Sequence, residues 1–235
     1  MEPVKYQPHV GESRPYWRDA VLGINDGLVS MVLLIIGVVG GGLSRSQVLL
    51  TGIAGALAGA VSMGAGEYLA TKSQDEVFES EVDLEKTHIE HFRRQEVEQL
   101  YEMVRELGVD ERDIEPTVAA LSRNDQVLLN SMKVLEFGMV TTERRRPITA
   151  MLTSGGLFLA GALPSVVPFF FPTSGAVALT FAIVLTGVAL FAVGAGKTRV
   201  TRTNPVVAGM ENLLIAGLGG VIAYFVGRVV GSSLS

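Results

Sequence analysis

The stretch RDAVLGINDGLVSMVLLIIGVVG, residues 18–40, decides the fold of this chain. Beyond its first two residues it holds one charged side chain, Asp26, in an otherwise apolar and glycine-rich run. A helix needs about 20 such residues to cross the hydrocarbon core of a bilayer, and a run of this length exceeds the core of a cleaved export signal. The sequence therefore predicts a retained membrane-spanning helix over about 20–43.

Four further apolar, glycine-rich blocks follow this one. They lie at about 47–71, 148–171, 175–196 and 205–231, and each reaches the length that a spanning helix needs. Hydrophobic residues make up 48% of the 235 residues, more than one soluble domain uses. We therefore predict an all-α polytopic membrane protein with five transmembrane helices, whose termini lie on opposite sides.

Basic side chains gather in the loops on one side of these spans. They precede the first and third spans and separate the fourth from the fifth: Arg14, Arg18, Arg144, Arg145, Arg146, Lys197, Arg199 and Arg202. The opposite loops hold little beyond Arg45. Because cytosolic loops carry the excess of Lys and Arg, the N-terminus and the segment between spans two and three are expected in the cytosol. The rule identifies no particular membrane.

The segment between spans two and three is strongly acidic. Residues 74–146 hold 18 of the 24 acidic residues but 10 of the 19 basic ones. This balance argues against nucleic acid as a partner and favours cations. The chain has no cysteine, so a metal would need oxygen, imidazole or thioether ligands. We predict three parts: 1–73 with spans one and two, 74–146 as a cytosolic helical metal-binding domain, and 147–235 with spans three to five.

The acidic segment is predicted to be helical. Residues 67–107 contain no Gly or Pro, and apolar residues recur among the charges, which favours a helix that continues out of span two and ends at Gly108. After a turn over 108–116, residues 117–137 are expected to form one or two more helices.

Asp26 is the most informative single residue. An ionised carboxylate among apolar residues is costly unless it is solvated or paired, so an intramembrane acid is a functional candidate. Asp19 lies seven positions earlier, two helical turns, and both carboxylates can face one cavity. Alternatively, Asp26 caps a helix that is broken at Gly23 or Gly27, and Asp19 pairs with a neighbouring arginine. Glu211, in span five, is explicable as a cavity-lining acid or as the partner of an arginine.

Span two contains a thioether and a carboxylate on one helical face, because Met63 and Glu67 are four residues apart. Mg²⁺ and Ca²⁺ prefer oxygen ligands, whereas a methionine sulfur tolerates Fe²⁺ better. The pair therefore favours a transition metal. The alternative is that Met63 fills packing space and Glu67 reaches towards the membrane interface.

The acidic segment offers a second set of metal-capable side chains. Four of them recur at helical spacing and would form one stripe on a continuous helix, and a later helix adds a methionine and a glutamate four residues apart: Glu85, His88, Glu96, Gln99, Met132 and Glu136. A helical bundle that brings them together would collect metal. The alternative is an ordinary solvated charged face.

The motifs of residues 18–40, GAVSMGAGEYLATKSQ at 59–74 and the acidic helices before span three together resemble the vacuolar iron transporter family, over nearly the whole chain. The resemblance implies a homodimer of five-span subunits in the bilayer, which exchanges cytosolic Fe²⁺, and often Mn²⁺, for protons and is not an enzyme. It also implies a cytosolic metal-binding domain, which can hold other divalent metals.

The resemblance also implies roles for single residues. Asp26 and Met63 would form the metal site on the translocation path, with Asp19 near its entrance and Glu67 close by. In the cytosolic domain, four residues match metal-binding positions of the family: Glu85, Glu96, Met132 and Glu136. His88 and Gln99 stand where the family has glutamates, which predicts a weaker or differently selective cytosolic site.

Two rival functions remain at this point. One is a membrane-anchored divalent-metal buffer or sensor that does not transport, against which the intramembrane Asp26 argues. The other is a di-iron oxidase, which normally needs a Glu-x-x-His pair on each of two helices, whereas Glu85 and His88 supply one.

Overall fold

The computed structural model describes residues 14–138 and 145–234, and these residues are helical apart from short connections. Within them, five helices are long and apolar enough to span a membrane: Trp17–Gly40, Arg45–Glu106, Pro147–Phe170, Gly175–Arg199 and Pro205–Ser233. Each contains one predicted span or nearly all of it, so the prediction of an all-α chain with five such helices is confirmed. The segment before Arg14, and Arg144 of the basic loops, lie outside the described residues.

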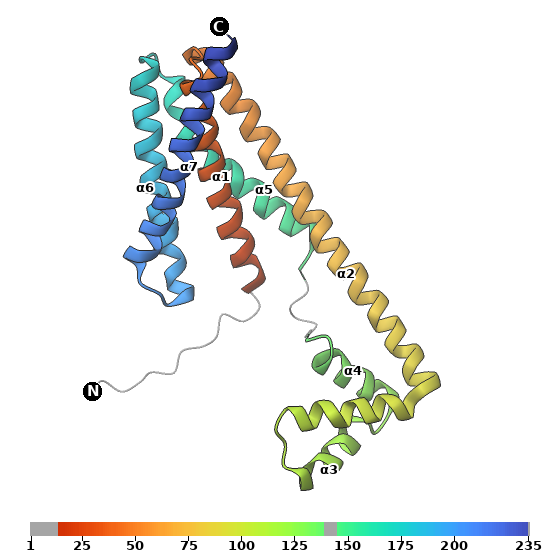
Figure 1. Cartoon of the computed structure of the whole chain (residues 1–235). Coiled ribbons are helices and arrows are strands. Elements are labelled where there is room, and N and C mark those ends of the chain that lie inside the picture. The colour runs from red at the N-terminus through yellow and green to blue at the C-terminus, as the bar shows by residue number, and fades with distance from the viewer. Residues whose placement is uncertain (1–13, 139–144, 235) are drawn as a thin grey trace, which may run out of the picture. The chain divides into compact units, whose positions relative to one another are not determined.

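The chain forms two compact units. The membrane unit comprises the described residues up to Leu69 and from Arg146 onwards, and the insert unit comprises those of Ala70–Arg145. Figure 1 labels the elements in chain order, which are α1 (Arg14–Gly40), α2 (Arg45–Glu106), α3 (Glu111–Leu121), α4 (Asp125–Leu135), α5 (Pro147–Val166), the 3-10 helix η3 (Val167–Phe170), α6 (Gly175–Thr201) and α7 (Pro205–Leu234). Helix α2 contributes its first part to the membrane unit and its remainder to the insert unit.

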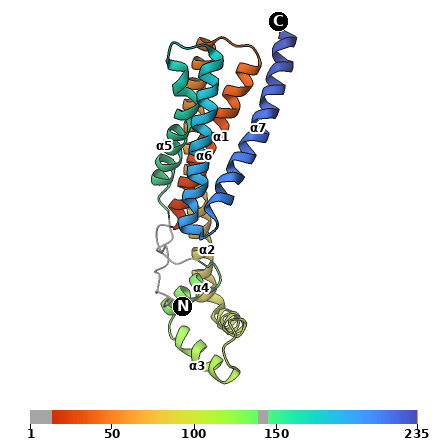
Figure 2. The ribbon, with the colours of Figure 1, turned by 90° about the vertical axis from the view of Figure 1, so that its left-hand side faces the viewer.

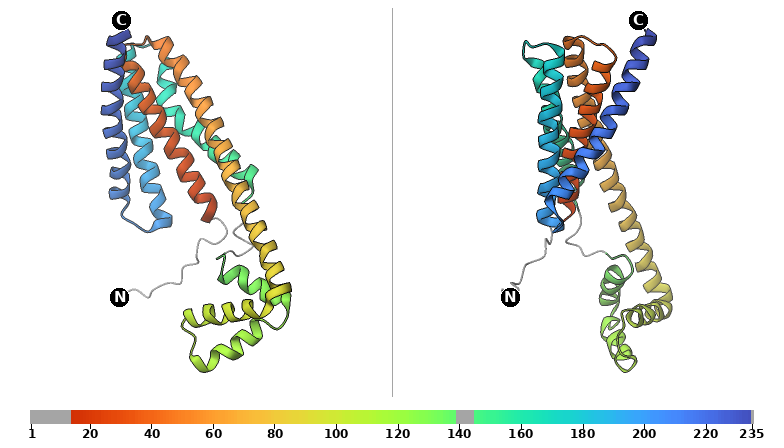
Figure 3. Two further views of the ribbon diagram at one scale, coloured as in Figure 1. Left: turned by 45° about the vertical axis from the view of Figure 1, so that its right-hand side comes forward. Right: turned by 60° about the vertical axis from the view of Figure 1, so that its left-hand side comes forward.

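Helix α1 is central to the membrane unit. It contacts α5, α6 and α7, and Figure 3 shows it between the α6–α7 pair and α5. Gly23 and Gly27 allow the approach of α5, because a Cβ at either position would collide with the backbone carbonyl oxygen of Ser154 or Phe158. The helix runs unbroken through both glycines, so the idea that Asp26 caps a broken helix is wrong.

Helix α7 packs on α1 through small residues and diverges from α6 towards its C-terminal end (Figure 2). A Cβ at Gly231 would collide with the backbone of Gly41, so the two helices touch main chain to main chain. Its other faces expose large apolar side chains, among them Leu214, Leu218 and Val226. In water such a surface would be unfavourable, and it is the surface expected of a helix that faces lipid.

The insert unit has its own apolar core between α2, α3 and α4. Its fully or nearly buried members are Ile89, Leu100, Val104, Ile114, Val118, Leu128, Leu129 and Met132. Asn124 caps α4 by accepting a hydrogen bond from the Val127 backbone N–H, at 2.9 Å. Arg93 joins α2 to the start of α4, since it donates to Asp125 Oδ1 at 2.9 Å and to the Ser122 carbonyl oxygen.

One expectation for α2 is wrong. The helix is not continuous from span two to its end, because Phe92 has a non-helical backbone with φ −130° and ψ 30°, and the yellow part of the ribbon in Figure 1 turns sharply. Ile89 and Val104 lie on either side of this bend and both belong to the same core. On a straight helix they would lie about 22 Å apart, too far for two 11-residue helices to cover well. We therefore attribute the bend in α2 to the packing of both of its parts into one core, since no Gly or Pro lies at this position.

The ends of the insert helices agree with the sequence in part. Gly108 has a left-handed φ of +83° just beyond α2, as its role in ending the helix predicts. The expected turn extends less far than Pro116, because α3 already begins at Glu111 and includes this proline. Glu111 and Asp113 in the first turn of α3 are favourable there, since acidic side chains stabilise a helix N-terminus.

Candidate functional site

The membrane unit contains a cavity of about 520 Å³ between α1, α2 and α5. Its lining residues are Asp26, Ser30, Met31, Leu34, Gly55, Gly59, Ser62, Met63, Gly66, Glu67 and Phe158. The structure thus brings together three of the four residues that the sequence places on the translocation path, namely Asp26, Met63 and Glu67. They come from two separate helices, so their meeting depends on how α1 packs on α2.

Two serines were missed by the sequence analysis. The Ser30 hydroxyl donates a hydrogen bond to Asp26 Oδ1 at 3.0 Å, and Ser62 lines the same cavity. Their positions in the sequence could have indicated this, because Ser30 lies one helical turn after Asp26 and Ser62 directly precedes Met63. The cavity therefore presents carboxylate, hydroxyl and thioether groups, a donor set that suits Fe²⁺ or Mn²⁺ better than Mg²⁺ or Ca²⁺.

Small residues and one aromatic ring shape this cavity. A Cβ at Gly59 would collide with the ring of Phe158, which is 3% exposed. Phe158 in turn packs with Met31 and with Ala60 in an apolar cluster. The metal-binding side chains thus face a space with an apolar wall. A cation in this space would be stabilised chiefly by those few polar side chains.

Asp19 does not line this cavity. It is fully buried, and seven residues of helix place it about 10 Å from Asp26 along α1. The predicted alternative of an ion pair with Arg18 is not present, and the side chain of Arg14 is not among those described. A role at the entrance of the path stays a prediction.

The insert unit holds a compact group of metal-capable side chains. Ligand atoms of Glu85, His88 and Glu96 all lie within 4.8 Å of one another, and His88 Nδ1 is 3.3 Å from Glu96 Oε1. On a straight helix the Cα atoms of residues 85 and 96 would be about 16 Å apart, so one ion would not reach both side chains easily. The bend at Phe92 makes the group possible, and the predicted stripe on a continuous helix is therefore wrong in its geometry.

Both carboxylates of this group are buried, with Glu85 4% and Glu96 5% exposed. Glu85 Oε1 and Glu96 Oε2 have no hydrogen-bond partner among the described residues. The pKa of Glu85 is raised to about 7, chiefly by burial and also by the negative charges of Glu96 and Glu136, while His88 acts in the opposite direction. Two buried oxygens without donors, next to an imidazole, form an arrangement that a cation would satisfy.

The remaining predicted residues of the insert unit lie close to this group or in the core. Gln99 Nε2 donates to Glu136 Oε1 at 3.1 Å, and the charge of Glu136 acts on Glu85. Met132 is fully buried in the apolar core, where it packs with residues such as Leu128. The structure therefore gives Met132 a packing role, while its predicted role as a ligand stays a prediction.

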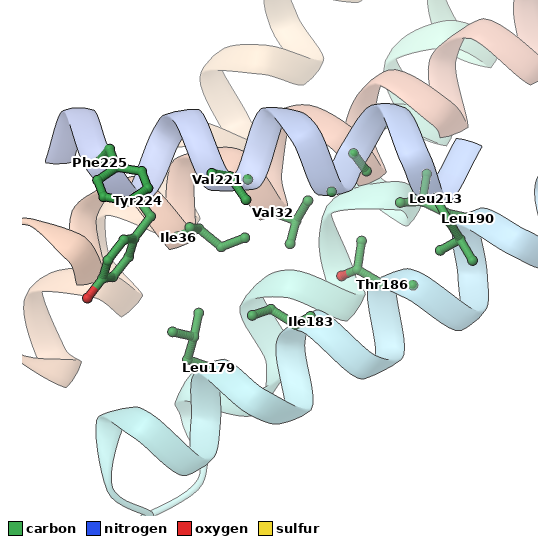
Figure 4. A pocket seen from close by; sticks show the side chains of 14 residues that line it. Val32, Ile36, Leu179, Ile183, Thr186, Leu190, Leu213, Val221, Tyr224 and Phe225 are labelled. Carbon is green, nitrogen blue, oxygen red and sulfur yellow. The ribbon is translucent and has the colours of Figure 1, made fainter. Parts of the chain in front are cut away.

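A separate cavity, of about 410 Å³, lies between α1, α6 and α7 (Figure 4). The labelled side chains around it are almost all apolar, among them Val32, Ile183 and Leu213. The exceptions are two residues with hydroxyl groups, Tyr224 and Thr186, and that of Thr186 is already hydrogen-bonded to the Ser165 hydroxyl at 3.0 Å. Because this cavity offers no carboxylate, imidazole or thioether, it is unsuited to a cation.

Spanning helices around a cavity with carboxylate and thioether groups define a multi-pass membrane protein with a candidate site for a transition-metal cation. The model of the VIT family matches residues 17–228, nearly the whole sequence, and the chain therefore belongs to this family.

Curated relatives agree with this assignment. Vacuolar iron transporter 1 of Tulipa gesneriana is 32% identical over 92% of this chain and 87% of its own length. Vacuolar iron transporter 1 of Arabidopsis thaliana is 30% identical over 91% and 85%, and Protein CCC1 of Saccharomyces cerevisiae is 26% identical over 91% and 68%. The resemblance noted in the sequence is confirmed, and the chain is a transporter-family protein rather than an enzyme such as a di-iron oxidase.

Proposed function

We propose that this chain moves Fe²⁺ out of the cytosol across a membrane in exchange for protons, with Mn²⁺ as a second substrate. The observation that carries the proposal is the cavity where Asp26, Met63 and Glu67 meet between α1 and α2. An ionised carboxylate within a membrane span is costly, so its presence there indicates a function. The names of the relatives support iron as the cargo.

Exchange follows from the chemistry of the carboxylates. A metal ion binds the ionised form of Asp26 and Glu67, so metal and protons compete for the same oxygens. Met63 adds a soft ligand that favours Fe²⁺ over Mg²⁺ and Ca²⁺. The Ser30 hydroxyl orients the Asp26 carboxylate through its 3.0 Å hydrogen bond. Protons that arrive from the far side would then displace the metal into the compartment that they leave.

The insert unit is proposed to collect metal on the cytosolic side. Its support is the group of Glu85, His88 and Glu96, together with the acidic balance of residues 74–146. His88 and Gln99 bring less negative charge than glutamates would, so the unit is expected to bind divalent metals more weakly than in family members with glutamate there. The loop charges support a cytosolic N-terminus and insert unit, with the C-terminus opposite. We also propose a homodimer, as the family resemblance implies.

The direct test measures Fe²⁺ uptake into proteoliposomes with an acidic interior. The comparison is between the wild type, Asp26→Asn and the matched control Glu98→Gln, which replaces an exposed carboxylate of the insert unit by the same amide. The proposal expects Asp26→Asn to lose gradient-driven uptake and the control to keep it. Uptake by correctly folded Asp26→Asn at the wild-type rate would overturn the assigned path.

A membrane-anchored metal buffer or sensor is the second candidate. The observation that favours it is that Glu85, His88 and Glu96 group within the insert unit, without any residue of the membrane cavity. If the wild type binds Fe²⁺ in equilibrium dialysis but moves none into vesicles at any imposed gradient, the buffer function replaces transport.

A further inference from the structure

Asp26 lines a second cavity besides the one that holds the metal donors. This cavity, of about 560 Å³, involves α1, α6 and α7, and we call it the basic groove. Its lining residues are Trp17, Arg18, Val21, Leu22, Asn25, Asp26, Val29, Lys197, Thr201 and Ile215.

The polar end of the basic groove is cationic. Arg18 is exposed, and no hydrogen bond or ion pair engages its side chain among the residues that the structure describes. Lys197 is partly buried and lies 3.8 Å from the exposed Glu211, which pairs with this lysine rather than with the arginine considered in the sequence analysis. A lysine ammonium has three donors, so one long contact leaves it able to bind an anion. Two cations on one cavity repel a divalent metal.

The rest of the basic groove is apolar. Val21, Leu22, Val29 and Ile215 line it, and Leu22 and Ile215 are also exposed on the surface of the bundle. From Arg18 to Val29 the groove follows α1 for about 16 Å. Trp17, 44% exposed, lies at the cationic end, where interfacial aromatic residues meet lipid headgroups. The groove therefore changes from basic to apolar along a helix that is expected to cross the bilayer.

We propose that the basic groove binds an anionic phospholipid. Its phosphate would lie between Arg18 and Lys197, because guanidinium and ammonium groups are the usual protein partners of phosphate. One acyl chain would follow Val21, Leu22 and Val29. Basic pockets between membrane helices on the cytosolic side bind acidic headgroups in this way, and the loop charges predict that side for this end of α1.

The bound lipid would have a consequence for Asp26. Because this residue lines both cavities, hydrocarbon in the basic groove would cover one side of it and leave the cavity with Met63 as its wet side. Metal would then be kept from passing sideways between α1 and α7. This consequence rests on the proposed transport function, whereas the binding of lipid does not.

Native mass spectrometry of the full chain, released from detergent with added lipid, tests the proposal. The probes are a phosphatidylglycerol, a phosphatidylcholine of the same chain length, and inorganic phosphate. The variant R18Q/K197Q is compared with R199Q/R202Q, which removes the same amount of charge at exposed positions near the C-terminal end of α6 that do not line the groove. If the double variant folds poorly, Leu22→Trp is the second test, because it keeps both cations and fills the apolar part of the groove.

We expect the wild type and R199Q/R202Q to retain phosphatidylglycerol in preference to phosphatidylcholine. R18Q/K197Q should bind it on the order of thirtyfold more weakly, since each basic side chain near an acidic lipid contributes about 1 kcal/mol. Leu22→Trp should also fail to retain phosphatidylglycerol. Equal retention by R18Q/K197Q and the wild type, or equal competition by inorganic phosphate, would overturn the proposal. A change of subunit number in R18Q/K197Q, with unchanged lipid, would assign the groove to a second copy instead.

Discussion

The two candidate metal sites of this chain are built in opposite ways. In the membrane unit, Asp26 and Met63 come from different helices, and they meet in an open cavity because glycines let the helices approach. In the insert unit, Glu85, His88 and Glu96 come from a single helix that bends back at Phe92, and both carboxylates are buried. The first site has its candidate ligands on two helices, with room around them. The second has three clustered ligands, and its buried oxygens include two that find no hydrogen-bond donor among the described residues.

This difference indicates two different tasks. A site that passes a cation on must release it, so two carboxylates from different helices, a thioether and hydroxyl groups in an open cavity are suitable. A site that captures a cation from a dilute pool gains from several ligands that are already close together. Because the two sites lie in separate units, each can be changed without altering the other.

The largest expected effect comes from Gly27→Ala in the membrane unit. A Cβ at this position would collide with the carbonyl oxygen and backbone carbons of Phe158, which cannot move without shifting α5. We expect a loss of about 3 kcal/mol or more, which corresponds to about 10 °C in the unfolding midpoint followed by size-exclusion fluorescence. Gly156→Ala, on α5 with open space around it, is the control and should be neutral or slightly stabilising. Equal midpoints for the two variants would contradict the close packing.

Glu96→Gln should separate capture from transport. The variant removes one ligand of the buried group, so anaerobic Fe²⁺ titration of the full chain is expected to show binding weaker on the order of 100-fold. The maximal rate of Fe²⁺ uptake at saturating metal should remain that of the wild type, because the membrane cavity is unchanged. Glu98→Gln, at an exposed position, should alter neither measurement. A proportional loss of binding and maximal rate would show that the two sites act as one.

Glu85→Gln should stabilise the metal-free chain at pH 8. The pKa of Glu85 is raised from 4.5 to about 7 in the folded chain, chiefly by burial, so the folded state holds this proton at pH values where the unfolded state has lost it. Stability therefore falls as the pH rises from about 4.5 to 7, and the full penalty is present above pH 7. The amide cannot ionise, so we expect a midpoint a few degrees higher than in the wild type at pH 8 and little gain near pH 4.

The control for this pH dependence is Glu90→Gln, which removes an exposed carboxylate from the same helix. Its thermal midpoint should follow the wild type at both pH values. If Glu90→Gln and Glu85→Gln gain equally at pH 8, general charge repulsion in the acidic unit explains the effect, and the burial of Glu85 does not.

The smallest effect is expected from Arg93→Gln. This residue follows the bend and joins α2 to Asp125 and to the Ser122 carbonyl oxygen. Both partners of the ion pair are substantially exposed, so we expect a loss of at most about 1 kcal/mol in stability and a modest weakening of Fe²⁺ binding. Arg94→Gln, an exposed neighbour, is the matched control. A larger loss in Arg94→Gln than in Arg93→Gln would contradict this role.

The fold of the membrane unit was predictable because lipid restricts the choices. An apolar block of 20 residues or more that meets lipid must satisfy its backbone as a helix, and the predicted spans agree with the structure. The pairing of Met63 with Glu67 followed from helical spacing. Ser30 and Ser62 escaped notice because a serine in a span usually serves packing, and their role depends on how α1 meets α2.

The geometry of the insert unit was less predictable. The types of ligand could be read from the sequence. The bend at Phe92 could not be predicted, because no Gly or Pro is present there to break the helix. It results from residues far apart in sequence, since Ile89 and Val104 share a core with Leu128 of α4. Local propensity favours a straight helix here, and tertiary packing overrides it.

The central claim is that metal passes through the membrane cavity in exchange for protons. The most direct measurement follows internal pH, with a trapped indicator, in acidic proteoliposomes while Fe²⁺ is added outside. The account predicts that Fe²⁺ makes the interior more alkaline with the wild type and with Glu96→Gln at saturating metal, and that Asp26→Asn abolishes the change. Entry of Fe²⁺ with no change of internal pH in the wild type would contradict it.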